Sequence, residues 1–212
     1  MSSIISKWQP AFIESTHSSD GSVTVALHTM HTSLFPMEEN PKHIQTYYSK
    51  IYSQSFYMRL HGGIKTQAEV ATLINGYINC KKQNDMSIGF EVFATDGPQT
   101  IRSDVLFNQH FKGVISLNHG LQPGHAHLFW AFKDDAWKSG VAQEAIRAIV
   151  DDYINWAREK KYQVNSSPIT DLEALVESDS DHAIKALTSV GMKEKTTSDH
   201  HRHFLLHFDA KV

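Results

Sequence analysis

The stretch Ala126–Glu144, AHLFWAFKDDAWKSGVAQE, joins an aromatic run to a charged turn and then to a helical pattern. After His127 every residue as far as Phe132 is apolar, so both faces of the run are apolar. This is typical of a strand buried inside a sheet. From Gly140 onward, apolar residues recur at spacings of three and four, as in an amphipathic helix. These residues are Val141, Ala145, Ile146, Ile149, Tyr153 and Ile154. The stretch therefore predicts a buried strand that leads through a small-residue turn into a long helix.

The turn before this helix has the features of an anion site. The first turn of a helix leaves backbone N–H groups without intrahelical partners, and these donors and the helix dipole favour a negative group. Gly140 and Ala142 would let a phosphate approach the backbone, and Lys138 adds a positive charge. No acidic side chain lies between Lys138 and Ala142. The local pattern is equally compatible with an ordinary strand–helix turn.

The segment Trp137–Ala145, WKSGVAQEA, resembles the coenzyme A pyrophosphate loop of GNAT-type N-acyltransferases. That loop usually reads Gln/Arg-x-x-Gly-x-Gly/Ala. The tryptophan in the first place and the Glu-Ala that follows are similar to the Rim-type branch, which acetylates the N-termini of ribosomal proteins. Downstream, residues 172–176 and 186–192 resemble the fifth strand of the family, its next helix and the Gly-Phe ending. The resemblance is close from about Gly113 to Phe208 and extends to the N-terminal half only in outline.

Length and composition bound the class of protein. For 212 residues we expect one domain, 22–212, preceded by an N-terminal extension, 1–21. The net charge of −3 gives no overall basic field for nucleic acid. The single cysteine, Cys80, excludes an internal disulfide and fits a reducing compartment. The start of the chain lacks the pattern of a signal peptide, and no apolar run is long enough to span a membrane. We therefore expect a cytoplasmic protein with no nucleic-acid or membrane partner.

The order of predicted elements indicates an α/β (α+β) fold with a mixed, mostly antiparallel sheet and helices on both faces. The expected strands are 23–28, 88–94, 113–117, 126–132, 171–176, 192–196 and 202–208, with a further short one at 105–107. The expected helices are 41–52, 66–83, a long one from 140, and one from Ser178 or Asp179 to about 189. Thr66-x-x-Glu69 is a capping box, and Gly191 is expected to end the last helix. The resemblance implies a twisted GNAT-like sheet of about six or seven strands, whose central parallel pair splays to hold coenzyme A.

The resemblance also implies a reaction. It is the transfer of an acetyl group from acetyl-CoA to a primary amine by direct attack in a ternary complex, with no metal. The acceptor would be a small amine or a peptide or protein N-terminus. The pyrophosphate would lie on Lys138, Ser139, Gly140, Val141 and Ala142, and the pantetheine along the main chain of Phe129, Trp130, Ala131 and Phe132. Trp137 would either cover the pyrophosphate turn or anchor the loop to the fold.

His127 is the first candidate for the base, because it falls where many family members carry a glutamate early in the fourth strand. A neutral imidazole accepts a proton near pH 7 without tuning. The alternative is a partly buried strand histidine that is hydrogen-bonded to a neighbour. His119 is a weaker candidate, and with His125 it could border the acceptor cleft. An amine that arrives deprotonated would need no base at all.

The sequence departs from the family pattern at the proposed acid. Ser180 occupies the place of the usual asparagine that contacts the cofactor, and Ala183 stands where the Rim-type pattern has a serine. No tyrosine lies between Asp179 and Gly191 to replace it. A second hypothesis is therefore an acyl-CoA-binding sensor or partner protein that has lost efficient turnover. Either protein would be a monomer or a homodimer.

Two further groups of residues have open interpretations. The cluster Asp199–His203, with His207 beyond it, has the residue types of a metal site but no standard zinc spacing, so we interpret it as the turn and exposed face of a final hairpin. On a strand, His203 and His207 would share one face, and Phe204 and Phe208 the other. An aromatic group near the N-terminal helix could line the acceptor cleft or simply pack on the sheet. Its members are Tyr47, Tyr48, Tyr52, Phe56 and Tyr57.

Overall fold

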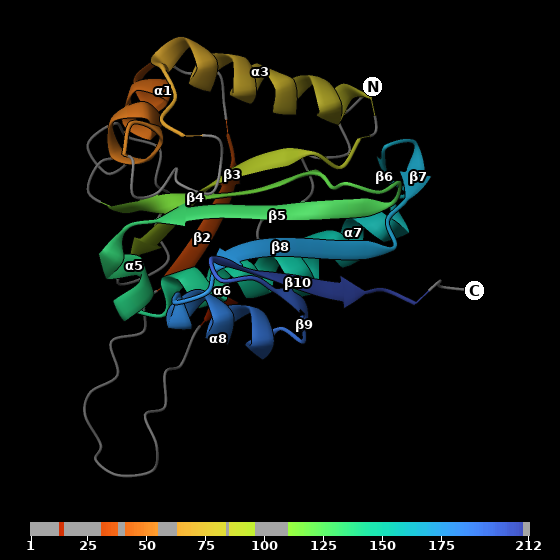
Figure 1. Ribbon diagram of the computed structural model, residues 1–212. Helices are drawn as coiled ribbons and strands as arrows, with labels where there is room; N and C mark the ends of the chain where they lie inside the picture. Colours follow the sequence, from red (N-terminus) through yellow and green to blue (C-terminus); the bar gives the residue numbers. More distant parts are fainter. Residues whose placement is uncertain are drawn as a thin grey trace.

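An eight-stranded sheet runs through the middle of the molecule (Figure 1). The computed structural model describes residues 13–14, 31–37, 41–54, 63–83, 85–95 and 110–209. The strands of the sheet are β1 (Ile13–Glu14), β2 (His31–Pro36), β3 (Ile88–Thr95), β4 (Phe111–His119), β5 (His125–Phe132), β8 (Asp171–Glu177), β9 (Lys193–Thr197) and β10 (His201–His207). They lie in the order β1-β2-β3-β4-β5-β8-β10-β9, and among them β5 and β8 alone are parallel neighbours. The predicted mixed, mostly antiparallel sheet with one parallel pair is confirmed.

The parallel pair separates after a short stretch. β5 and β8 pair only at His125–Asp171, Ala126–Leu172 and His127–Glu173, although both strands continue beyond these residues. On its other side β5 stays paired with β4 as far as Phe132. Among the described strands, the backbone of β5 from Leu128 to Phe132 therefore has a neighbour on one side only. This is the splay that the family resemblance implies.

Helices cover both faces of the sheet (Figure 1). One face carries α1 (Pro41–Tyr47), η2 (Tyr48–Tyr52) and α3 (Gln67–Lys82), and the other carries α6 (Val141–Arg147), η3 (Ala148–Tyr153), α7 (Ile154–Glu159) and α8 (Asp181–Ser189). The segments α6, η3 and α7 form one continuous helix with a π-helical centre, so the predicted long helix is confirmed. A short helix that the sequence analysis did not predict, α5 (Asp134–Lys138), follows β5 directly.

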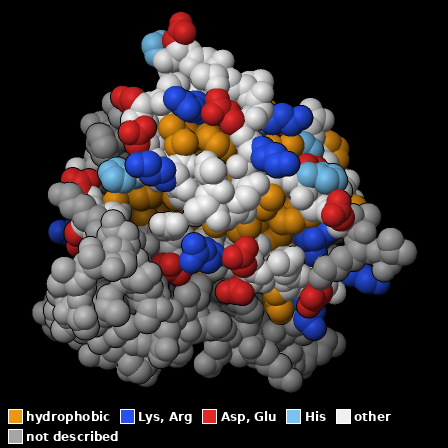
Figure 2. All heavy atoms as spheres, turned by 90° about the horizontal axis from the view of Figure 1, so that it is seen from below, with side chains coloured by type: hydrophobic (Ala, Val, Ile, Leu, Met, Phe, Trp, Pro, Cys, Tyr) orange, Lys and Arg blue, Asp and Glu red, His pale blue; other side chains and the backbone are white. Residues whose placement is uncertain are grey.

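Two apolar cores hold the helices to the sheet. The core under α6–α8 contains the periodic residues of the long helix, including Ile146 and Ile149, together with Leu172 and Phe204. The core under α1 and α3 is rich in aromatic residues. Its large fully buried side chains include Tyr47, Tyr52, Phe93 and Phe111. Figure 2 shows the face of the molecule on the α6–α8 side, where the described Lys, Arg, Asp and Glu side chains are interspersed.

Several local predictions can be checked directly. The capping box is formed, because the Thr66 hydroxyl accepts a bond from the Glu69 N–H and the Glu69 carboxylate accepts one from the Thr66 N–H at 2.6 Å. Gly191 follows α8 with a left-handed φ of +83°. The N-cap of α8 is Ser180, so the predicted start at Ser178 or Asp179 was wrong, and the Ser180 side chain makes no capping bond.

The remaining differences lie near the N-terminus and between the main elements. The strands predicted at 23–28 and 105–107 lie outside the described residues, and β2 was not predicted. β1 lies within the segment that was expected to be an extension, and it pairs with β2. After α7 the chain forms a small hairpin of β6 (Gln163–Val164) and β7 (Ser167–Pro168), which was not predicted. In the described part of the chain, no helix is long and apolar enough to cross a membrane.

Candidate active site

The turn before α6 presents unpaired backbone donors. Gly140 is the N-cap in the left-handed region, with φ +79°, and it contributes no side chain. Its carbonyl oxygen accepts the Glu144 N–H at 3.1 Å, which is the first bond of the helix. Among the described residues, no hydrogen bond reaches the N–H groups of Val141, Ala142 or Gln143. The turn can therefore bind an anion through main-chain donors at the positive end of a helix.

Trp137 connects this turn to the rest of the fold. Its ring packs edge-on against Phe132 at 5.6 Å between centroids and stacks on His182 of α8 at 6.5 Å. The Ser139 hydroxyl donates to the carbonyl oxygen of Asp135 at 2.7 Å, so it closes the end of α5. The side chain of Lys138 lies outside the described part of the structure. Of the two roles considered for Trp137, these contacts match anchoring of the loop.

A cavity of about 220 Å³ lies between the sheet and the helices η2 and α3. Its described lining residues are Tyr52, Lys65, Leu73, Tyr77, Asn118, His127 and Phe129. The Tyr77 hydroxyl donates to Asn118 Oδ1 at 3.0 Å, and the Tyr52 ring stacks on Phe129 at 6.5 Å between centroids. The cavity thus combines aromatic walls with a few polar groups, as small-molecule sites usually do.

Tyr52 carries the least satisfied of these polar groups. The residue is 1% exposed, and its hydroxyl has no hydrogen-bond partner among the described residues. Burial raises the pKa of Tyr52 well above its usual range, and the nearby Tyr77 phenol adds to the shift. The hydroxyl therefore stays protonated and is available as a donor to a molecule in the cavity.

His127 faces the same cavity from β5. Burial lowers its pKa, Glu173 raises it and His203 lowers it, and the net shift is downward. The imidazole is therefore neutral near pH 7 and free to accept a proton. His119, the weaker candidate, is 2.7 Å from Asp85 Oδ2 and is not among the described lining residues. His125 instead lies 3.4 Å from Asp171 and 3.7 Å from Glu173.

The aromatic group near the N-terminal helix divides between the two interpretations. Tyr52 lines the cavity, whereas Tyr47 is fully buried and its hydroxyl donates to the Glu91 carboxylate. Tyr48 packs against the core under α1 and α3. Phe56 and Tyr57 lie outside the described residues.

Helix α8 has no proton donor at position 183. Ala183 is buried, at 4% exposure, within the core on the α6 side of the sheet, and Ser180 lies at the helix start. An alanine has no proton to donate, so the departure from the Rim-type pattern persists in three dimensions.

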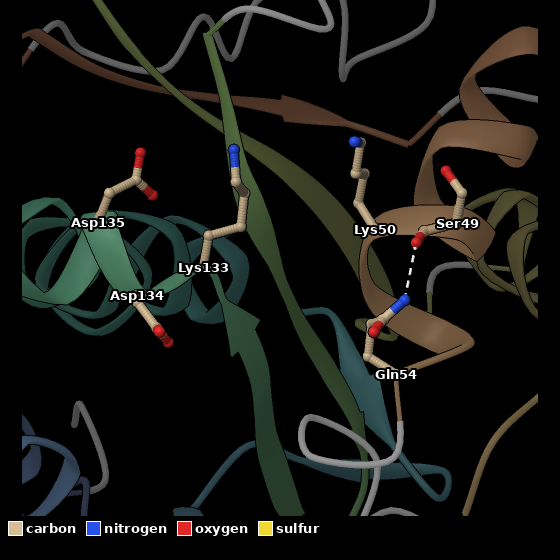
Figure 3. Close-up of a pocket in the computed structure, with 6 residues that line it drawn as sticks. All are labelled: Ser49, Lys50, Gln54, Lys133, Asp134 and Asp135. Carbon is tan, nitrogen blue, oxygen red and sulfur yellow. Dashed lines mark hydrogen bonds between the residues drawn. The ribbon is translucent and has the colours of Figure 1, made fainter.

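A second hollow, of about 430 Å³, lies where β5 passes into α5. Ser49, Lys50 and Gln54 line it from the η2 side, and Lys133, Asp134 and Asp135 line it from the β5–α5 side (Figure 3). Asp135 is engaged by Lys112 at 2.6 Å, and Lys133 Nζ is 3.4 Å from the Phe111 carbonyl oxygen. The mixed charges and existing pairs of this hollow make it a weaker ligand site than the cavity beside His127.

The C-terminal histidines form a hairpin face, as predicted. His203 and His207 lie on one face of β10 and contact carboxylates of β8, and Phe204 on the other face enters the core. In the described residues, no group of three or more His, Cys, Asp or Glu side chains is arranged to hold a metal ion.

With this geometry in hand, comparison with known proteins decides the family. The profile of the acetyltransferase (GNAT) domain matches residues 34–193, which is most of the chain. The chain belongs to the GNAT acetyltransferase family. It is therefore an acyl-CoA N-acyltransferase by family, and the Rim-type branch is compatible with its structural neighbours.

Solved GNAT structures share this fold at low identity. RimL, a ribosomal L7/L12 alpha-N-protein acetyltransferase solved with coenzyme A, has a TM-score of 0.60 at 12% identity, covering 85% of this chain and 96% of its own. A GNAT-family acetyltransferase from Bacillus anthracis has a TM-score of 0.55 at 13% identity, with 83% and 94% covered. A Vibrio cholerae spermidine N-acetyltransferase chimera has a TM-score of 0.57 at 11% identity, with 83% and 95% covered. No curated protein sequence matches the chain.

Sequence reasoning missed part of this candidate site. Leu73 and Tyr77 were predicted only as part of the helix at 66–83, and Lys65 and Asn118 were not singled out. The helical spacing of Leu73 and Tyr77 is the same whether these side chains pack on the sheet or border a cavity. Periodicity therefore could not distinguish a packing role from a cavity role. Glu173 was likewise unnoticed, because nothing in the sequence relates it to His127.

Proposed function

We propose that this protein transfers an acetyl group from acetyl-CoA to a primary amine by direct attack within a ternary complex. The observation that carries the proposal is the separation of β5 from β8 after His127, with the unpaired donors of the Gly140 turn following β5. The family profile supports acetyl-CoA as the cosubstrate. The site would promote the reaction by positioning both substrates where β5 and β8 separate.

The pantetheine would pair with the one-sided backbone of Phe129–Phe132, and the pyrophosphate would lie on the turn Lys138–Ala142. Gly140 matters most in this turn, because its left-handed φ disfavours a residue with a Cβ and because it leaves the N–H donors uncovered. Ser180 at the start of α8 would be a minor polar contact to the cofactor. Trp137 would fix the loop through its contacts with Phe132 and His182.

The acceptor amine would enter the cavity that His127 and Tyr52 line. It would be a small amine or the N-terminus of a peptide or protein. RimL acts on a protein N-terminus, and the spermidine N-acetyltransferase acts on a small amine, so the shared fold is compatible with both. Among the described lining residues, Lys65 is the only charged group. Its positive charge disfavours an acceptor with several positive charges.

His127 would take a proton from the amine nitrogen, and the neutral nitrogen would attack the thioester carbonyl. The Tyr52 hydroxyl is a neutral donor for the polar atoms of the bound substrates. After the attack the nitrogen would still lose a second proton, and the sulfur of coenzyme A would leave as a thiolate that takes one up. Since Ala183 cannot supply a proton to the sulfur, we assign the transfer of this second proton from the nitrogen to the sulfur to His127, after it has passed on the first.

A second candidate function is an acyl-CoA-binding sensor or partner protein, and Ala183 in place of an acid favours it. The two candidates separate when the protein is mixed with acetyl-CoA and a broad panel of amines. Release of coenzyme A identifies the transferase. Tight binding without release across the panel identifies the sensor.

We further propose that residues 22–212 form the single acyltransferase domain, to whose sheet β1 is added, as a monomer or a homodimer. A cytoplasmic location is supported by the one cysteine of the chain. Light scattering of the purified chain measures the oligomeric state, and limited proteolysis locates the domain boundary.

The cofactor site is tested by calorimetric titration of acetyl-CoA into the wild type, Gly140→Asp and Gly140→Asn. Both substitutions carry the same backbone strain at φ +79°, and Asn and Asp tolerate this region better than most residues. Only Asp places a negative charge against the pyrophosphate. We expect the Asn variant to bind within about ten-fold of the wild type and the Asp variant to lose about a hundred-fold or more. Equal binding by both variants, or none by the wild type, would refute this cofactor site.

A further inference from the structure

Two buried carboxylates lie among the histidines beside the acceptor cavity. Asp171 and Glu173 of β8 are 8% and 4% exposed. His207 Nδ1 is 3.0 Å from Asp171 Oδ1, and His203 Nε2 is 3.4 Å from Glu173 Oε2. His125 lies between the two carboxylates, 3.4 Å from Asp171 and 3.7 Å from Glu173. The cofactor and acceptor sites proposed above use none of these contacts.

Glu173 is aligned with the proposed base. It is the parallel-sheet partner of His127, at the last paired position before β5 and β8 separate. One of its oxygens, Oε1, accepts the Leu121 N–H at 3.0 Å, which leaves Oε2 to face histidines. Of those histidines, His125 points a buried Nδ1 at Glu173, whereas the His203 side chain is 33% exposed. His127, at the cavity, is thus in register with a buried carboxylate, and this carboxylate in turn contacts a partly exposed histidine.

The reaction needs such a route. At neutral pH an amine arrives as an ammonium ion with three N–H protons, and the amide product retains one. One of the two lost protons ends on the sulfur of coenzyme A, and the other must reach solvent. His127 is half-buried behind η2 and α3, so a proton that it accepts needs a path out of the cavity.

We propose that Glu173 and His203 form the proton exit of the acetyl-transfer site: they receive from His127 the proton that each ammonium releases and pass it to solvent at β10. This inference rests on the proposed acetyl transfer. It assigns Glu173 and His203 as positioning and relay residues that act through His127 and touch neither substrate.

The groups that face His127 fit this assignment. From the cavity side they are Tyr52, Tyr77, Asn118 and Lys65, of which Lys65 alone carries a charge at neutral pH. From β8 and from β10 beyond it they are Glu173 and His203, and these two act on the pKa of His127 in opposite directions. The Glu173 carboxylate raises the pKa of His127, whereas His203 lowers it.

The test compares Glu173→Gln, His203→Gln and His207→Gln with the wild type in steady-state acetyl transfer. Gln at 173 keeps an oxygen for the Leu121 N–H and removes the charge, so we expect the fold to be retained. His207 is the matched control, because it contacts Asp171 rather than Glu173. We expect kcat to fall by on the order of ten-fold to a hundred-fold in the first two variants and less than about two-fold in the control. Added imidazole should restore His203→Gln, whose missing group is at the surface, and leave Glu173→Gln impaired.

A second readout is the titration midpoint of the His127 ring by NMR, which needs no catalysis. Loss of the Glu173 charge should lower the midpoint, loss of His203 should raise it, and the acid limb of the pH profile should move with each. A His203→Gln enzyme with wild-type kcat, or a midpoint unmoved in both variants, would overturn the exit while acetyl transfer stands. If the wild type transfers acetyl to no amine while binding acetyl-CoA, the proposed function itself fails.

Discussion

At the scale of single residues, Tyr52 and Ala183 show how side chains shape the candidate site. Ala183 is buried where the related Rim-type pattern has a hydroxyl, so one expected proton donor is missing. Tyr52 brings a hydroxyl into the cavity from η2, on the opposite face of the sheet. A buried hydroxyl without a protein partner costs about 1–3 kcal/mol, which a bound molecule or water can offset. The unpaired group is therefore better explained by binding than by stability.

Replacing Tyr52 by Phe tests this explanation against Tyr77→Phe in the same cavity. The Tyr52 hydroxyl has no partner among the described residues, whereas the Tyr77 hydroxyl donates to Asn118. We expect thermal unfolding of Tyr52→Phe at or above the wild-type temperature and a loss of about 1 kcal/mol in Tyr77→Phe. The KM for the amine should rise several-fold in Tyr52→Phe. A Tyr52→Phe protein as destabilised as Tyr77→Phe would show that the hydroxyl has a structural role.

At the scale of elements, α3 forms one wall of the cavity and depends on its first turn. Leu73 and Tyr77 line the cavity from this helix, and Val70 and Ile74 bury it on the core. The capping box closes the helix start through Thr66 and Glu69. Hydrogen bonds from the Thr66 backbone and side chain lower the pKa of Glu69 and keep it ionised for this role. The position of α3 as the cavity wall therefore depends on the stability of its Thr66–Glu69 cap.

Thr66→Ala should lower the free energy of unfolding by about 1 kcal/mol, because the N-cap acceptor of α3 is lost. Thr72→Ala is the control on the same helix: its hydroxyl only bonds back to the Ala68 carbonyl oxygen, and alanine is the better helix former. Urea unfolding measures both variants. Hydrogen exchange should show faster opening of α3 in Thr66→Ala alone. Equal stability of the two variants would contradict a stabilising cap.

At the scale of the whole molecule, the proposed cofactor site joins parts that are distant in sequence. β5, the Gly140 turn and α8 lie together only because the long helix returns the chain to β8 beside β5. A ligand that binds these parts in the folded state alone stabilises the whole fold by mass action. Binding can therefore be read from global unfolding.

Acetyl-CoA at about one hundred times its Kd should stabilise the wild type by about 2.7 kcal/mol. For a chain of this size, the midpoint of thermal unfolding should then rise by roughly 5–10 °C. Gly140→Asn should show most of this rise and Gly140→Asp almost none. The same rise in Gly140→Asp would place the cofactor away from the turn.

Sequence alone predicted the elements whose signals are local. The buried strand, the turn at Gly140 and the long helix follow from the periodicity of one segment, and the capping box and Gly191 follow from residue types at fixed spacing. Local signals failed at β2 and at α5, which lie beside or within polar segments. The N-cap of α8 was predicted at Ser178 or Asp179 and lies at Ser180, within a run of polar residues. Periodicity reports which face of an element is buried and not what that face contacts.

Only the tertiary structure decided the contacts between elements. The cavity joins Tyr52, Tyr77 and His127, and strand register sets Glu173 beside His127 and His203. A shift of one residue in the β5–β8 or β8–β10 pairing would move Glu173 to the opposite face of the sheet. These strand registers depend on packing over the whole molecule, so they cannot be predicted from any short segment of the sequence. The sequence determined the family and the turn that we propose for the cofactor, and the fold determined which side chains meet in the cavity.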